Sequence, residues 1–191
     1  TISDDIETVR ALRAAVGDAV EILVDYNQGL DRQEALRRGL ALQAEGVCWM
    51  EEPLHVTDDA GLAWLSAQLE MPVQGGENWW GVTGMARSLA AGATDLCMPD
   101  VMKMGGVTGF LRGMALAAAH RVPLSSHIFI EASAHLLSVS PLRHYVEHLD
   151  IAGALLCAPL RVEGGMATLP DVPGLGMEWD EAALSAHAAD A

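Results

Sequence analysis

The chain has 191 residues, 51% hydrophobic and 19% charged, which is enough to build one sizeable core and excludes a disordered chain. Its formal net charge of −15 excludes a basic surface for nucleic acid and argues against an anionic membrane as partner. No apolar run approaches the ~20 residues of a membrane span. Cys48, Cys97 and Cys157 lack metal-ligand spacing, which indicates reduced thiols and a cytoplasmic location.

Short apolar runs alternate with amphipathic segments along most of the chain. The runs predict strands and are bounded by turn residues: EILVD (21–25), VCWMEE (47–52), MPVQGGE (71–77), TDLCMPD (94–100), RVPLSSH (121–127) and RHYVEHL (143–149). The segments predict helices, with capping residues or leucines at helical spacing: 4–17, 31–46, 58–69, 83–92 and 108–120. This alternation predicts an α/β fold with a parallel sheet.

The repeat favours a TIM-type barrel over a dinucleotide-binding fold, because no glycine-rich fingerprint follows any strand. The chain holds fewer strand–helix units than the eight of a complete barrel. We therefore expect residues 1–150 to form a partial barrel, from the helix after strand two through strand eight. Residues 151–191 are rich in Gly and Pro and predict an irregular, hairpin-like segment that ends in a short helix or tail.

A titratable residue stands at or near the end of each predicted strand: Asp25, Glu51, Glu77, Asp100, His127 and Glu147. In a parallel barrel these ends meet at one mouth, where active sites lie. Asp25, Glu51 and Glu77 would project from consecutive strands, and three adjacent carboxylates need a proton or a cation at neutral pH. Mg²⁺, which prefers oxygen ligands, meets that need. The alternative is that each acid caps a helix or pairs with a surface arginine.

Asp100 and His127 end neighbouring predicted strands. A carboxylate behind an imidazole fixes its tautomer and raises its basicity, so the pair predicts a general base or acid. A purely structural histidine is the alternative. Glu147 has apolar neighbours and, if buried, would stay protonated and could donate a hydrogen bond to a developing oxyanion. Taken by itself, Glu147 fits a surface glutamate on a helix better.

Several polar and aromatic residues near these strand ends allow two interpretations. Glu52 is expected to point away from Glu51, either supporting the site from behind or forming a salt bridge. Lys103 points either into the mouth or to solvent. Trp79 and Trp80 follow Glu77 and could wall a pocket or pack in the core.

Seven stretches, in this order and spacing, resemble the mandelate racemase subgroup of the enolase superfamily: VDYNQ (24–28), MEEP (50–53), GGEN (75–78), MPDVMKMGGVTG (98–109), PLSSH (123–127), EASAHLL (131–137) and YVEHLD (145–150). The resemblance runs from about residue 20 to residue 179. It implies a (β/α)₇β barrel with an α+β capping domain, toward which residues 151–191 would wrap back. It also implies a homo-oligomer, often an octamer.

The resemblance implies a role for eight residues. Mg²⁺ would be bound by Asp25, Glu51 and Glu77. His127, supported by Asp100, would be one acid–base catalyst. The substrate carboxylate would accept a hydrogen bond from Glu147. The substrate pocket or its surroundings would include Asn27 and Lys103.

The activity that the resemblance implies is removal of the α-proton of a small 2-hydroxy carboxylate through a stabilised enolate, giving racemisation. An acid-sugar dehydratase of the same subgroup, acting on aldonates or aldarates, is the alternative. The subgroup's Lys-x-Lys motif, whose second lysine is the other base, does not occur in this sequence. We therefore expect the intact protein to be longer, and a non-catalytic barrel fragment remains the third interpretation.

Overall fold

The computed structural model of the chain describes residues 1–188. Six short strands form one parallel sheet whose spatial order follows the sequence: β1 (Val24–Asp25), β2 (Met50–Glu51), β3 (Val73–Gly75), β4 (Leu96–Cys97), β5 (Leu124–Ser126) and β6 (Arg143–Val146). Each predicted apolar run contains one of these strands. The predicted α/β fold with a parallel sheet is therefore confirmed.

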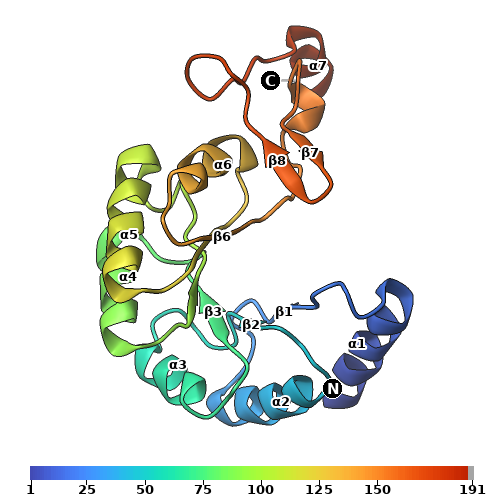
Figure 1. Cartoon of the computed structure of the whole chain (residues 1–191), viewed down its shortest axis with the longest axis vertical. Coiled ribbons are helices and arrows are strands. Elements are labelled where there is room, and N and C mark those ends of the chain that lie inside the picture. Colours follow the sequence, from blue (N-terminus) through green and yellow to red (C-terminus); the bar gives the residue numbers. More distant parts are fainter. Residues whose placement is uncertain (189–191) are drawn as a thin grey trace.

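One helix precedes β1 and one follows each of the strands β1 to β5: α1 (Ile2–Val16), α2 (Arg32–Ala44), α3 (Asp59–Ser66), α4 (Gly81–Ala91), α5 (Gly106–His120) and α6 (Ile130–Ser138). Figure 1 shows the helices along the outer side of an arc, with the strands on its inner side. Caps explain some helix starts, since the Asp31 side chain accepts a hydrogen bond from the Glu34 N–H at the start of α2.

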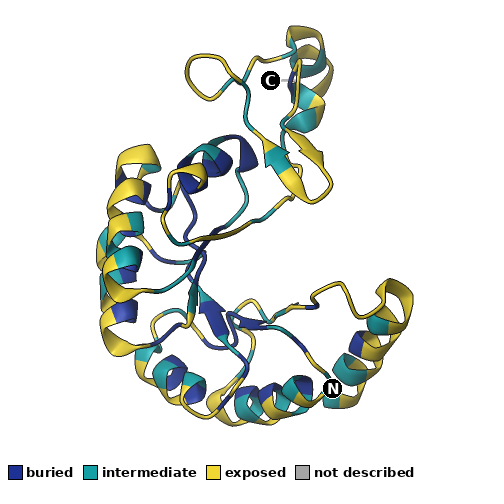
Figure 2. Cartoon of the chain, viewed as in Figure 1, coloured by how far each residue is buried: buried dark blue, intermediate teal, exposed yellow. Residues whose placement is uncertain are grey.

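Apolar residues join the strands to the helices behind them. Met50, Val73 and Leu124 on the strands and Phe110 on α5 are all fully buried. Burying each such side chain contributes roughly 1.5–3 kcal/mol. Figure 2 shows that buried residues follow the central strands and the inward sides of the helices, while the outer helix faces are exposed. The edge strands β1 and β6 hold no fully buried residue. This packing holds the strand ends, and hence the residues after them, in fixed positions.

The arc is open. Within the described residues β1 pairs only with β2, and β6 pairs only with β5. Figure 1 shows the opening between the α1–β1 end of the arc and the C-terminal segment. The six strands thus form part of a barrel wall.

Residues 151–188 lie beyond the sheet. They contain a 3₁₀ turn, η1 (Gly153–Leu155), an antiparallel hairpin of β7 (Arg161–Glu163) and β8 (Met166–Thr168), and a short helix, α7 (Glu181–His187). The last three residues of the predicted C-terminal segment lie outside the described residues. No described helix has the length and apolar character needed to cross a bilayer.

Candidate metal and acid–base site

Three carboxylates meet at the C-terminal ends of the first three strands. Asp25 ends β1 and stands directly beside Glu51, which ends β2. Glu77 lies two residues past β3 and reaches the site through a turn at Gly76, whose φ is +143°. A Cβ added to Gly76 would lie 2.8 Å from the backbone carbonyl carbon of Met98, so only glycine fits there.

The geometry of this carboxylate cluster suits a small divalent cation. Asp25, Glu51 and Glu77 each offer one oxygen, and the three oxygens lie within 4.8 Å of one another. Octahedral Mg²⁺ with oxygen ligands at 2.0–2.1 Å separates opposite ligands by about 4.2 Å, so small side-chain adjustments suffice. In the described part of the chain none of the three pairs with an arginine or caps a helix. The alternative of helix caps and surface arginine pairs therefore does not apply.

Crowding changes the protonation of this cluster. Burial, followed by the charges of Asp25, Glu147 and Glu77, raises the pKa of Glu51 to about 8. Burial likewise raises the pKa of Glu52 to about 7, although a hydrogen bond from Asn78 opposes the rise. At neutral pH the cluster therefore retains protons unless a cation supplies positive charge. This is the electrostatic requirement that a bound metal ion would satisfy.

His127 is held by Asp100 from the neighbouring strand. The two residues form a parallel bridge just beyond β4 and β5, and His127 Nδ1 lies 2.7 Å from Asp100 Oδ2. Asp100 is 2% exposed, and its Oδ1 accepts hydrogen bonds from the backbone N–H groups of Met102 and Lys103. Because the Asp100 carboxylate accepts the Nδ1 proton, Nε2 is the free nitrogen. Nε2 faces the carboxylate cluster, 3.3 Å from Glu77 Oε2.

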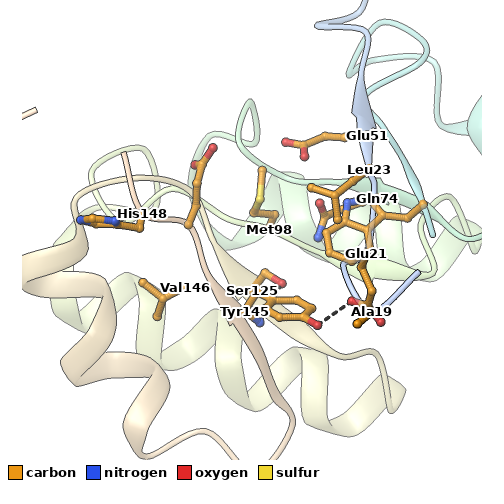
Figure 3. A pocket seen from close by; sticks show the side chains of 12 residues that line it. Ala19, Glu21, Leu23, Glu51, Gln74, Met98, Ser125, Tyr145, Val146 and His148 are labelled. Carbon is orange, nitrogen blue, oxygen red and sulfur yellow. Dashed lines mark hydrogen bonds between the residues drawn. The ribbon is translucent and has the colours of Figure 1, made fainter. Parts of the chain in front are cut away.

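Glu147 follows β6 and is half-buried, so its interpretation as a surface glutamate on a helix is wrong. Its Oε2 accepts a hydrogen bond of 2.8 Å from the backbone N–H of Ile128. Glu147 and Glu51 both line a cavity of about 600 Å³ on the inner side of the sheet. Figure 3 shows Glu51 at one end of this cavity and the hydrogen bond from Tyr145 to Glu21 at the other.

The two remaining candidates, Asn27 and Lys103, both contact polar side chains of the site. Asn27 donates to Asp25 twice, through its backbone N–H at 2.7 Å and through its side-chain amide. Lys103 points toward the site, and its Nζ donates to Asn78 Oδ1 at 2.9 Å. Asn27 is thus in direct contact with the carboxylate cluster, and Lys103 reaches it through Asn78.

Asn78 was not among the candidate residues. Its Nδ2 donates to Glu52 Oε2 at 2.7 Å and to Glu77 Oε1 at 2.9 Å. Glu52 forms no salt bridge with an arginine or lysine in the described residues and is hydrogen-bonded to Asn78 instead. The sequence gives one indication of this role: Asn78 directly follows Glu77, an expected metal ligand, and directly precedes Trp79.

The two tryptophans after Asn78 do not line the cavity. Trp79 is 3% exposed and packs in the core, while Trp80 is 77% exposed. The core interpretation therefore holds for Trp79, and neither interpretation holds for Trp80.

The sequence is similar to those of several characterised proteins. The sequence is 34% identical over 181 residues to L-talarate/galactarate dehydratase of Salmonella typhimurium strain LT2, covering 95% of this chain and 46% of that protein. It is 31% identical over 201 residues to D-galactarolactone cycloisomerase of Agrobacterium fabrum strain C58, covering 96% and 53%. The chain spans about half the length of the curated relatives it matches.

A solved structure agrees in fold and sequence. It is a crystal structure of an enolase from Bradyrhizobium complexed with magnesium and mandelic acid, with a TM-score of 0.93 and 43% identity. The alignment covers 97% of this chain and 51% of that one. The sequence model described as enolase C-terminal domain-like matches residues 1–183. Fold, site geometry and these matches together show that the chain belongs to the enolase C-terminal domain-like family.

Proposed function

We propose that this chain carries the metal-binding and acid–base residues of an enzyme that removes the α-proton of a 2-hydroxy carboxylate. The observation that carries the proposal is the placement of the free His127 nitrogen 3.3 Å from Glu77, at the edge of three converging carboxylates. A base beside a cation site is the arrangement that α-proton removal requires, because the charge released onto the substrate must be stabilised where it develops.

Asp25, Glu51 and Glu77 would hold Mg²⁺, the ion present with mandelic acid in the Bradyrhizobium structure. When bound, the ion supplies positive charge that stabilises the negative charge developing on the substrate carboxylate. Asn27 would fix the orientation of Asp25 through its two hydrogen bonds. The raised pKa of Glu51 supports this assignment, because a cation removes the need for the retained proton.

His127 and Glu147 would act on the substrate itself. Asp100 holds the Nδ1 proton of His127, so Nε2 would exchange a proton with one face of the α-carbon, taking it from one enantiomer and delivering it to the enolate formed from the other. Racemisation requires a second acid–base group on the opposite face, the role of the second lysine of the Lys-x-Lys motif in the subgroup that the sequence resembles. Glu147, in its protonated form, would donate a hydrogen bond to the substrate carboxylate from the cavity it shares with Glu51. The backbone N–H of Ile128 fixes one oxygen of Glu147 and leaves the other for the substrate.

Racemisation is the outcome we propose, with dehydration of an acid sugar as the second candidate. The 43% identity to a protein crystallised with mandelic acid supports the first, and the 34% identity to L-talarate/galactarate dehydratase supports the second. The two reactions diverge after α-proton removal: in one a proton returns to the opposite face, and in the other a β-hydroxyl group is lost. Mandelate has no β-hydroxyl, so its turnover can only be racemisation.

The assay that separates these outcomes uses single enantiomers of mandelate and a library of aldonic and aldaric acids, each with Mg²⁺. Loss of optical rotation without a keto product identifies racemisation, and appearance of a 2-keto acid identifies dehydration. No turnover of any acid, and no exchange of the α-proton with deuterated water, would contradict the proposal and leave a non-catalytic protein.

The His127→Asn substitution tests the role of the base. Asparagine can still donate a hydrogen bond to Asp100 but cannot take up a proton, so we expect a loss of at least about 10²-fold in kcat. The Kd for Mg²⁺, measured by titration calorimetry, should change much less than kcat, because all three metal ligands remain and only the contact of Nε2 with Glu77 is lost. Full activity of the variant would refute the assignment.

A further inference from the structure

Asn78 forms hydrogen bonds with three side chains, those of Lys103, Glu52 and Glu77. Its Oδ1 lies 2.9 Å from Lys103 Nζ, and its Nδ2 lies 2.7 Å from Glu52 Oε2 and 2.9 Å from Glu77 Oε1. Glu52 is buried, and Glu77, Asn78 and Lys103 are half-buried, so these contacts are partly shielded from water. The Asn78 amide therefore links the carboxylate cluster to Lys103 in the turn after β4.

The chemistry of the partners fixes the orientation of this amide. An ammonium group only donates hydrogen bonds and ionised carboxylates only accept them, whereas an asparagine amide does one at each end. With Lys103 on its oxygen, Asn78 must present both N–H bonds to Glu52 and Glu77. The reversed orientation would place the amide oxygen against two carboxylates and the amide nitrogen against the ammonium. Lys103 thus determines how Asn78 meets Glu77.

Lys103 is itself held at both ends of its backbone. Its N–H donates to Asp100 Oδ1 at 2.9 Å, and its C=O accepts from the Gly81 N–H at 3.0 Å. It is also the single lysine in the 191 residues. These backbone hydrogen bonds fix the position of the Lys103 Cα, and the side chain extends from there to Asn78. The same carboxylate, Asp100, anchors both Lys103 and His127.

We propose that Asn78 and Lys103 are positioning residues that hold Glu77 for Mg²⁺, with Lys103 acting through Asn78 and not on the substrate. This inference rests on the proposed function, because it takes Glu77 as a metal ligand. Groups that hydrogen-bond to a metal ligand orient it and typically change metal affinity by 10–100-fold when removed. Losing either residue should therefore weaken Mg²⁺ binding even though neither touches the ion.

The experiment is a double-substitution cycle read out as the Kd for Mg²⁺. Titration calorimetry is performed on the wild-type protein, Asn78→Ala, Lys103→Met and the double variant. We expect each single substitution to raise Kd by about 10-fold or more. The double variant should bind about as tightly as Asn78→Ala, because the hydrogen bonds that join Lys103 to Glu77 run through the Asn78 amide.

Gln43→Ala provides the matched control. Gln43 also uses a side-chain amide to bridge two segments, accepting from the Glu70 and Met71 N–H groups at 2.7 and 2.9 Å, but it lies outside the site. Its loss should lower the melting temperature and leave the Kd for Mg²⁺ unchanged. Circular dichroism of each variant shows that it is folded, and Lys103→Met keeps the test available if Asn78→Ala does not fold.

Different outcomes overturn different parts of the account. A wild-type Kd in both single variants, or effects that add fully in the double variant, would overturn the positioning roles. A Lys103→Met variant that raises KM for the acid without changing the Kd for Mg²⁺ would place Lys103 on the substrate. If Glu77→Gln also binds Mg²⁺ like the wild type, the metal assignment in the proposed function fails instead.

Discussion

At the residue scale, the carboxylate cluster makes stability depend on pH. The pKa of Glu51 is raised from 4.5 to about 8, chiefly by burial and then by Asp25, Glu147 and Glu77. Between these pH values the folded state keeps a proton that the unfolded state releases. The free energy of unfolding of the metal-free protein should therefore fall as pH rises from about 4.5 to about 8. Urea unfolding in EDTA at several pH values measures this slope.

Glu51→Gln is the control for this pH dependence, because the amide is neutral at every pH. Its unfolding free energy should change less with pH than that of the wild type over the same range. Adding Mg²⁺ should stabilise the wild type more at pH 8 than at pH 5.5, since the ion binds the ionised carboxylates. Equal slopes for the two proteins would mean that Glu51 does not carry the effect.

The sequence shows the charged members of the site but hides the amide that joins them. Asp25, Glu51, Asp100 and His127 are recognisable because each ends an apolar run, and such ends meet at one edge of a parallel sheet. Asn78 has no such pattern. Its role depends on contact with Lys103, 25 residues away, and only the three-dimensional structure brings these two side chains together.

At the element scale, the turn after β3 sets the position of Glu77. Gly76 adopts a φ of +143° against the backbone of Met98. In Gly76→Ala the new Cβ would force β3 and β4 apart or displace Glu77, so we expect a lower melting temperature together with weaker Mg²⁺ binding. Thermal unfolding and titration calorimetry on the same sample measure both effects.

Gly46→Ala separates backbone strain from this steric effect. Gly46 also has a positive φ, +73°, but a Cβ there would meet no atom within 4 Å. We expect a loss of about 1 kcal/mol in stability from the strain alone, with no change in the Kd for Mg²⁺. If both variants bind Mg²⁺ like the wild type, the turn at Gly76 does not position Glu77.

Helices with clear start signals were predictable and one without such a signal was not. The helix expected over 31–46 appears as α2, Arg32–Ala44, because Asp31 caps it. No separate helix was predicted at Ile130–Ser138. Its N-cap is Phe129, which has a positive φ of 45° and makes no side-chain cap, so the sequence shows no start there. The contacts of α6 with β5 and β6 stabilise it in place of a cap.

At the scale of the whole molecule, the site is built from residues of all six strands of the sheet or of the turns that follow them. Each strand of the sheet supplies one candidate residue at or just beyond its end, so the site forms only when the parallel sheet is in register. The sheet edges at β1 and β6 have no strand partner on their outer sides within residues 1–188. Leu23, next to β1, is 45% exposed and Tyr145, on β6, is 46% exposed.

The measurement that tests the account most directly is Mg²⁺ binding to the wild-type protein and to Asp25→Asn, Glu51→Gln and Glu77→Gln. Titration calorimetry at pH 8 should give one ion per chain for the wild type. Each substitution should raise Kd by at least about 10-fold, because each removes a charged oxygen ligand from the same ion. Absence of Mg²⁺ binding to the wild type, or wild-type affinity in all three variants, would contradict the central claim that these carboxylates share one cation.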